Sequence, residues 1–193
     1  MARVLPFDNF VARKIQKWKH RAQEWKINFI DAIGVSPLEE MIYFWNGYKR
    51  MRPEHLEVSL QRLAWSISSE NPLWARETLD EQAMLSILRA ATMRGMKRTE
   101  DAKRILKTEI LNHEWSEFKG HLKDNWTCPC AHYEMAVNCW IEHNASPDKS
   151  KKLLQECSEW LEKVAKWESY EMDTRYDFLL HNERRGANSM CYL

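Results

Sequence analysis

The stretch ILRAATMRGMKRTEDAKRIL, residues 87–106, decides the fold, because its pattern of a helical run, a glycine and a second helical run recurs along the chain. The first run ends at Gly95. Corresponding runs end at Gly47 and at His143, so the three positions are spaced 48 residues apart. A fixed period of this length is the sequence signature of a protein built from stacked repeats.

The second helical run keeps the same register in the last two units, where TEDAKRIL at 99–106 is followed 48 residues later by PDKSKKLL at 147–154. In the first unit, PEHLEVSL begins two positions later relative to its glycine. Each unit is predicted to be a helical hairpin, which buries its apolar face only by stacking against its neighbours. The alternative is an irregular helical bundle whose spacings coincide by chance.

Apolar residues elsewhere in the chain also follow the period of a helix. One stripe, with alternating spacings of four and three, consists of Val11, Ile15, Trp18, Ala22, Trp25 and Phe29. No segment alternates with period two, so no sheet is predicted. We predict an all-α fold of stacked helical hairpins, a tetratricopeptide-like α-solenoid. Its roughly eight helices are expected near residues 8–33, 37–49, 53–66, 73–95, 99–113, 129–143, 147–166 and 168–185.

Prolines and glycines mark the ends of these helices. Proline suits the first helical position, and the SPLE stretch at 36–39 also matches a capping box, in which Glu39 reaches back to the amide of Ser36. Asn71-Pro72 and Ser146-Pro147 are predicted helix starts, whereas Gly34 and Gly95 are predicted helix ends.

We expect one α-helical repeat domain over residues 1–187. It contains hairpins at about 37–66, 73–113 and 129–166, flanking helices at 8–33 and 168–185, and a tail at 188–193. The positions expected to pack the repeats together are Trp45, Gly47, Gly95, Pro129, Tyr133, Trp140 and Trp160.

Composition excludes several classes of protein. Charged residues make up 30% of the 193, yet the net charge is only +1, which argues against a nucleic-acid binder. Five cysteines, no apolar run of membrane-spanning length and no signal-peptide pattern favour a reducing, intracellular setting with free thiols. No oligomeric state is predicted.

The stretch NWTCPCAHYEMAVNCWIEHN, residues 125–144, raises the question of a metal or thiol site. Cys128, Cys139 and His143 form a conceivable zinc set, but only Cys139 and His143 have the spacing of four residues that places two ligands on neighbouring turns. Cys128 at a helix start is a conceivable nucleophile. We favour the third interpretation, that these cysteines are small core residues, and we predict no metal, no cofactor and no catalytic residue.

Three stretches resemble the inclusion body clearance proteins of fungi, which are related to the animal tetratricopeptide-repeat 39 proteins. They are SPLEEMIYFWNGYKRM at 36–51, DNWTCPCAHYEMAVNCW at 124–140 and ESYEMDTRYDFLLHNER at 168–184, and they occur in the order found in that family. Cys130, His132 and the segment after Gly186 depart from the family pattern.

The resemblance implies a C-terminal portion of a longer helical-repeat protein, with more repeats upstream. It also implies a non-enzymatic protein of the cytoplasm and nucleus that binds other proteins and helps to clear protein inclusions in connection with lipid droplets.

An alternative function follows from the first helix, in which basic residues surround the apolar stripe. Such a basic amphipathic helix can lie on a lipid-droplet or membrane surface. The residues expected at that surface are Arg13, Lys14, Lys17, Trp18, Arg21 and Trp25. The competing interpretation is a helix that faces the protein core and exposes its charged side to water.

Overall fold

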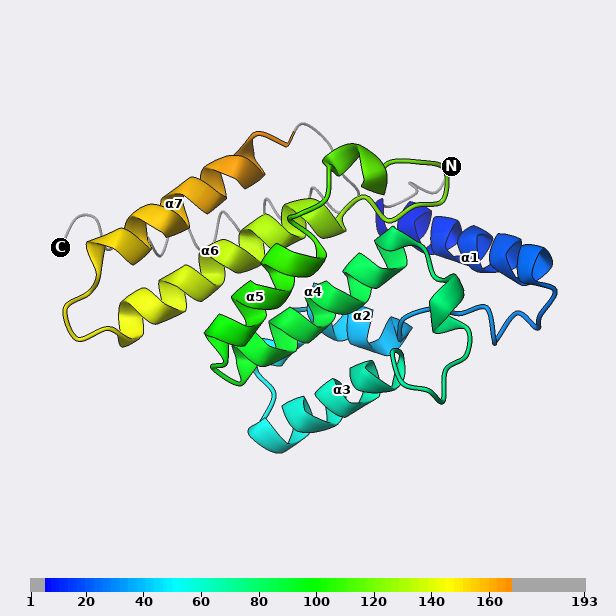
Figure 1. Ribbon diagram of the computed structural model, residues 1–193, viewed down its shortest axis with the longest axis horizontal. Coiled ribbons are helices and arrows are strands. Elements are labelled where there is room, and N and C mark those ends of the chain that lie inside the picture. Colours follow the sequence, from blue (N-terminus) through cyan, green and yellow to red (C-terminus); the bar gives the residue numbers. More distant parts are fainter. Residues whose placement is uncertain (1–5, 168–193) are drawn as a thin grey trace.

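The computed structural model describes residues 6–167, which form seven α-helices and three short 3-10 helices (Figure 1). In chain order these are α1 (Pro6–Trp25), α2 (Pro37–Phe44), η1 (Gly47–Lys49), α3 (Pro53–Trp65), η2 (Trp74–Arg76), α4 (Leu79–Gly95), α5 (Thr99–Glu109), η3 (Trp115–Phe118), α6 (Thr127–Ala145) and α7 (Lys151–Ala165). The described residues contain no strand, so the predicted all-α class is confirmed. The expected helix 168–185 and the tail 188–193 lie outside the described residues.

The helices after α1 stack side by side in one array. α4 packs against α2, α3, α5 and α6, and α6 packs against α5 and α7. α3 therefore lies at one edge of the array and α7 at the other (Figure 1). α4 with α5 and α6 with α7 are antiparallel hairpins, as the repeat predicts. The expected hairpin 37–66 differs, because α2 has only eight residues and α3 packs mainly along α4.

The first helix is shorter than the predicted range 8–33. It ends at Trp25 because Lys26 adopts a left-handed conformation with φ 56°. The N–H of Ile27 then donates to the carbonyl of Ala22 at 3.1 Å, the hydrogen bond that closes a Schellman turn. Residues 26–35 continue as turns, not as a helix.

Left-handed residues other than glycine also follow α2 and α4, since Asn46 has φ 52° and Lys97 has φ 64°. α4 ends at Gly95 as predicted, although the left-handed turn there is made by Lys97. The predicted helix end at Gly34 is wrong, because α1 already stops at Trp25.

Gly95 also has a packing role. A Cβ atom there would lie 3.0 Å from the carbonyl oxygen of Tyr48 and 3.1 Å from the side chain of Leu56, so the absent side chain lets η1 and α3 approach α4.

Several predicted starts also shift. Ser36 makes no side-chain cap, and a carboxylate oxygen of Glu39 accepts from the Tyr48 hydroxyl at 2.8 Å, so the predicted capping box does not form. α7 begins at Lys151 and not at Pro147, because the Ser150 hydroxyl accepts the N–H of Leu153.

The remaining shifts are at α4 and α6. α4 begins at Leu79, six residues after its expected start at 73, since η2 intervenes. α6 begins two residues before Pro129, which lies within the first turn, where its missing N–H would have no helical partner.

An apolar core joins the central helices, and an aromatic cluster connects it to α1. Fully buried Leu85, Ile87 and Leu88 of α4 belong to the same cluster as Ile105 and Leu106 of α5. The aromatic cluster contains Phe10, Tyr43, Phe44 and Trp126, with ring centroids 5.3 Å apart for Phe10 and Phe44 and 5.0 Å apart for Phe44 and Trp126. Burial of these rings anchors α1 and α2 at the start of α6.

Candidate functional site

The inner face of α1 is basic. Lys14, Lys17 and Arg21 are spaced three and four residues apart, so they share one face of the helix, and all three are buried. Val11 and Ile15, which belong to the predicted apolar stripe, are instead 38% and 36% exposed. The expectation that Lys14, Lys17 and Arg21 form an exposed lipid-binding surface is therefore wrong.

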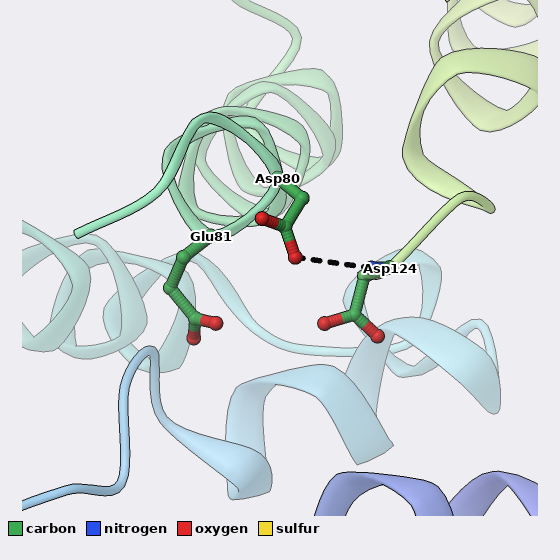
Figure 2. A group of neighbouring side chains, drawn as sticks. All are labelled: Asp80, Glu81 and Asp124. Carbon is green, nitrogen blue, oxygen red and sulfur yellow. Dashed lines mark hydrogen bonds between the residues drawn. The ribbon is translucent and has the colours of Figure 1, made fainter. Parts of the chain in front are cut away.

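Three carboxylates surround the ammonium group of Lys17. Figure 2 shows them converging, with Asp80 and Glu81 extending from the start of α4 and Asp124 from the loop that leads into α6. The Nζ atom of Lys17 lies 2.7 Å from Asp80 Oδ2, 2.8 Å from Glu81 Oε2 and 2.6 Å from Asp124 Oδ2. Each distance is that of a charge-assisted hydrogen bond.

The same carboxylates could hold a divalent cation by their geometry alone. One oxygen of each of Asp80, Glu81 and Asp124 lies within 4.8 Å of the others, and oxygen donors suit calcium or magnesium. The ammonium of Lys17, however, already contacts all three carboxylates. We therefore interpret the group as an ion-pair cluster in which lysine supplies the cation.

Further ion pairs extend this cluster on both sides of Lys17. Lys14 lies 3.0 Å from Glu40 of α2, and Arg13 lies 2.7 Å from Asp124. At the other end, Arg21 lies 3.1 Å from Glu77 and 2.9 Å from Glu81. The complete ion-pair cluster consists of Arg13, Lys14, Lys17, Arg21, Glu40, Glu77, Asp80, Glu81 and Asp124. It joins α1 to α2, to α4 and to the loop before α6.

Backbone groups complete the hydrogen bonding of the cluster. The N–H of Asp124 donates to Asp80 at 3.0 Å, and the N–H of Val35 donates to Glu81 at 2.8 Å. Gly34 leaves room for this arrangement, because a Cβ there would overlap a carboxylate oxygen of Glu81 and lie 2.7 Å from Arg21 Nη1. The loop between α1 and α2 is thus ordered by the same charges that dock α1.

The cost of burying a charge is offset by nearby opposite charges for some members of the cluster more fully than for others. Burial alone would lower the pKa of Lys14 and Lys17, but the surrounding carboxylates outweigh burial and raise the pKa of both. Burial would raise the pKa of Glu81, yet Lys17, Lys14 and Arg21 hold that pKa at about 2. The pKa of Asp124 is likewise lowered, against burial, by Lys14, Lys17 and Arg13. These groups are charged at neutral pH.

Glu40 and Glu77 are the least compensated acids of the cluster. Burial, with a contribution from neighbouring carboxylates, raises the pKa of each to about 7, while Lys14 and Arg21, respectively, oppose the shift. The cluster has five carboxylates and four cationic side chains, so protonating one peripheral acid balances the buried charge. Its chemistry is therefore that of a charge-compensated structural contact.

A second buried ion pair joins the central helices. Arg94 of α4 donates through Nε to Glu134 of α6 at 2.5 Å and through Nη2 at 3.2 Å, the bidentate geometry that arginine favours. Burial alone would lower the pKa of Arg94, but Glu134 outweighs it and raises the pKa. The pair fixes the register of α4 against α6.

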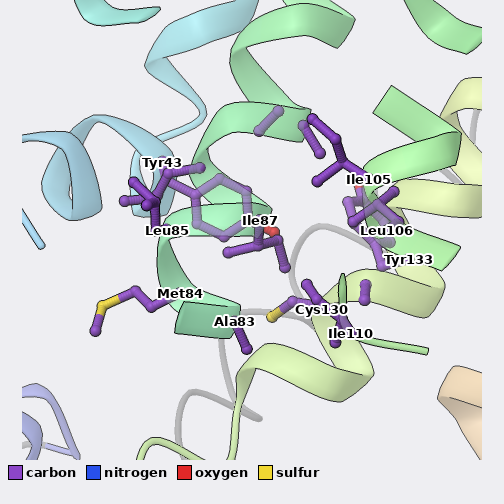
Figure 3. Packing of buried hydrophobic residues seen from close by; sticks show 14 of the residues in the cluster. Tyr43, Ala83, Met84, Leu85, Ile87, Ile105, Leu106, Ile110, Cys130 and Tyr133 are labelled. Carbon is purple, nitrogen blue, oxygen red and sulfur yellow. The ribbon is translucent and has the colours of Figure 1, made fainter. Parts of the chain in front are cut away.

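The cysteine-rich helix packs and does not gather ligands. Figure 3 shows Cys130 and Tyr133 among the core residues, near Ile110 and the residues of α5. Cys128 and Cys139 are eleven residues apart on α6, so their backbones are separated by roughly 16 Å along the helix axis. The ring of His143 donates to the carbonyl of Ser150 at 2.9 Å. The structure thus does not bring the candidate ligands Cys128, Cys139 and His143 together.

The thiols are also poor nucleophiles. Burial raises the pKa of Cys128 to about 12 and, with smaller contributions from nearby charges, that of Cys139 to about 11. Because the thiolate is the reactive form, these raised pKa values keep both thiols protonated at neutral pH and lower their reactivity.

Trp18 and Trp25 were predicted to lie at a lipid surface. In the structure, both rings lie next to cationic side chains of this chain. Lys14 Nζ lies 5.7 Å from the ring centroid of Trp18, and the guanidinium groups of Arg21 and Arg76 lie 5.1 and 4.6 Å from Trp25. Both indoles are half-buried. These cation–π contacts hold the outer side of α1 and the loop before α4 in place.

The residues predicted to pack the repeats have different roles. Pro129 and Tyr133 are buried, while Trp140 and Trp160 are half-buried between α6 and α7. Trp45 is 59% exposed, so its expected place in the packing between repeats is wrong. A Cβ on Gly47 would lie 3.0 Å from Ile42, which indicates a tight turn after α2.

The ion-pair cluster escaped sequence analysis because its members are far apart in the chain. Lys17 is 63 residues from Asp80 and 107 residues from Asp124. One local signal existed, since Lys14, Lys17 and Arg21 share a helical face in the same way as an apolar stripe.

Among the described helices, none has both the length and the apolar character that crossing a membrane requires.

Comparisons with known proteins show which family this sequence resembles. The model of the family described as Iml2/Tetratricopeptide repeat protein 39 matches residues 1–96. The inclusion body clearance protein iml2 of Aspergillus terreus is 51% identical over 91% of this chain, and that of Aspergillus niger is 50% identical over 91%. The inclusion body clearance protein IML2 of Pyricularia oryzae is 38% identical over 91% of this chain.

The chain spans 28% of the length of each of the two Aspergillus relatives and 23% of that of the Pyricularia protein. No solved structure matches the chain. The family-model match, residues 1–96, contains α1 to α4 and ends before α5. The chain belongs to the Iml2/tetratricopeptide repeat protein 39 family.

Proposed function

We propose that this chain is a non-enzymatic helical-repeat scaffold that binds other proteins and takes part in the clearance of protein inclusions. The observation that carries the proposal is its 51% identity, over 91% of its own length, to the Aspergillus terreus protein named inclusion body clearance protein iml2. Because the chain spans 28% of that relative, it would supply one part of the activity of a longer protein.

The use of the reactive side chains supports a scaffold. The carboxylates that converge at the start of α4 are compensated by Lys17, and burial raises the pKa of the Cys128 and Cys139 thiols of α6. The groups that could do chemistry are thus engaged in holding helices together. Stacked helical hairpins expose long helix faces, and such faces recognise a helix or an extended peptide of a partner.

A chimera tests the proposed role in clearance. The matching segment of the Aspergillus terreus relative is replaced by this chain, and the disappearance of fluorescent protein inclusions is followed in cells that lack the native relative. We expect the chimera to clear inclusions at a rate close to that of the unmodified relative. A version with the segment deleted serves as the control. A chimera that accumulates normally but clears no faster than the deletion would contradict the proposal.

A second candidate function is peripheral contact with a lipid-droplet surface. Phe29 and Ile30, in the loop after α1, are 41% and 77% exposed, and the ring of Phe29 lies 6.3 Å from that of Trp18. The loop thus extends the exposed apolar side of α1, which carries Val11 and Ile15. In this proposal apolar side chains, and not the buried lysines, enter the lipid.

Flotation of the whole chain with phospholipid-coated oil droplets tests this candidate. We expect the chain to float and the double variant Phe29→Asp, Ile30→Asp to remain in solution. The matched control Gln16→Asp, Gln23→Asp adds the same charge at exposed polar positions of α1 and should float like the parent. Absence of flotation by the parent would reject lipid contact.

We also propose that the protein acts in the cytoplasm and the nucleus. The support is that the three stretches at 36–51, 124–140 and 168–184 resemble stretches of the fungal clearance proteins and occur in the same order. Fluorescence microscopy of the tagged chimera tests this localisation, and signal confined to another compartment would contradict it.

A further inference from the structure

The two edges of the helical array expose different kinds of side chain. On α7 the exposed residues are mainly charged or polar, namely Lys151, Lys152, Gln155, Ser158, Glu159, Glu162, Lys163 and Lys166. On α3, Val58 and Trp65 are 42% and 52% exposed, and Ile67 just beyond the helix is 45% exposed. A terminal unit of a repeat protein needs a polar outer face to remain soluble. α7 has such a face, whereas α3 presents large apolar groups.

The two exposed apolar residues of α3 lie in one stripe with Arg62 between them. Val58, Arg62 and Trp65 are separated by four and three residues, so they lie along one side of the helix, with exposed Glu57 and Gln61 beside them. Leu56 and Leu63 are buried on the side that packs on the core. α3 is therefore apolar on two sides, the pattern of a helix that packs between two neighbours.

This stripe borders α2. The guanidinium of Arg62 lies 3.7 Å from Glu39, and Leu38, next to Glu39 in α2, is 56% exposed. We call the side of α3 that carries Val58, Arg62 and Trp65 the α3 face. Its two large apolar side chains flank the Arg62 guanidinium, and aromatic residues and arginine are enriched in protein interfaces.

We infer that the α3 face is the surface on which another helical hairpin of the longer family protein stacks. The chain spans only 28% of the length of its Aspergillus terreus relative, so most of a family protein lies outside it. The face continues the direction in which α7, α6, α5, α4 and α3 already stack (Figure 1). A further hairpin would cover the α3 face as α4 covers the opposite side of α3. This inference does not depend on a role in inclusion clearance.

Thiol labelling of the variant Val58→Cys tests the inference. Its reaction rate with a maleimide is measured in this chain alone and in the full-length chimera described above. We expect the introduced thiol to react at least tenfold more slowly in the chimera, because the stacked hairpin covers it. The control variant Leu154→Cys, at an exposed position of α7, should react equally fast in both proteins. Equal rates for Val58→Cys in the two proteins would overturn the inference.

Two further measurements separate the remaining occupants and guard against misfolding. If labelling of Val58→Cys in the chain alone slows as its concentration rises, a second copy covers the face and the inference is overturned. The double variant Val58→Glu, Trp65→Glu should lower the Tm of the chimera by several degrees and leave that of the chain alone unchanged, whereas Leu154→Glu should change neither. A chimera that protects Val58→Cys but fails to clear inclusions would contradict the proposed function and support this inference.

Discussion

α1 and α6 contact the same helix, α4, with a different balance of forces. α1 reaches the first turn of α4 through buried ion pairs to the carboxylates of Asp80 and Glu81, which Figure 2 draws. α6 packs along α4 mainly through aliphatic and aromatic side chains (Figure 3), to which the Arg94–Glu134 ion pair is added. Burying apolar area contributes directly to stability, while a buried ion pair must first offset the cost of removing both charges from water. The α6 contact should therefore supply net stability, and the α1 contact should specify where one helix is placed.

The strongest test of this difference removes the central cation of the α1 contact. Lys17→Met leaves Asp80, Glu81 and Asp124 without their shared partner, and breaking such a buried set costs about 3–5 kcal/mol of unfolding free energy. Urea unfolding measures the loss. Lys19→Met, at an exposed position of the same helix, should change stability by less than about 0.5 kcal/mol. A loss below about 1 kcal/mol for Lys17→Met would show that water reaches the cluster.

The corresponding test of the apolar contact removes a core side chain. Leu88 is fully buried in α4, and Leu88→Ala should cost about 3 kcal/mol through lost apolar burial and the remaining cavity. Leu154→Ala is the matched control, because Leu154 is 44% exposed and should tolerate truncation. Chemical unfolding of both variants measures the difference. Equal costs would contradict the assignment of the core to α4, α5 and α6.

The pH dependence of stability distinguishes the two contacts without changing the core. The pKa values of Glu40 and Glu77 rise from 4.5 to about 7 on folding, so the folded chain binds more protons between these pH values. The free energy of unfolding should therefore fall as the pH rises from about 4.5 to 7, by on the order of 3 kcal/mol for each of the two groups.

Below about pH 4.5, Glu81 and Asp124 reverse the slope, because their lowered pKa values make the unfolded chain the stronger proton binder. Unfolding curves at several pH values should thus show a maximum of stability near pH 4.5. Glu40→Gln should make the decline above pH 5 shallower, and Leu88→Ala should shift the whole curve without changing its slope. An unchanged slope in Glu40→Gln would contradict the pKa shift of that residue.

The smallest expected effects come from Gly→Ala substitutions at two close contacts, one beside the ion-pair cluster and one where η1 and α3 approach α4. Gly34→Ala should displace the Glu81 carboxylate and cost about 1–2 kcal/mol, the usual penalty for overpacking. Gly95→Ala meets Tyr48 and Leu56, but the higher helix propensity of alanine offsets part of the strain, so we expect about half that cost. Thermal unfolding compares the two variants, and a larger loss for Gly95→Ala would reverse the expected order.

The local sequence pattern predicted well which segments are helical and which helices pair as hairpins. The period of 48 residues placed α4 with α5 and α6 with α7, and the helical spacing of apolar residues gave the all-α class. The boundaries were less accurate, because Asn46 and Lys97 adopt left-handed conformations that sequence rules assign to glycine. The prediction that the cysteines of residues 125–144 are small core residues agrees with the burial of Cys128, Cys130 and Cys139. Their spacing already argued against a shared site, because side chains on one helix meet only at short spacings.

The sequence by itself determined that the chain forms helical hairpins which must stack, because helical periodicity and turn residues act within a few positions of one another. Only the tertiary structure decided which side of α1 is buried. Lys17 faces inward because Asp80 and Asp124, 63 and 107 residues away, are brought to the same point by the stacking of α4 and α6. A basic stripe has no local property that reveals such distant acids, so its burial depends on the assembled array.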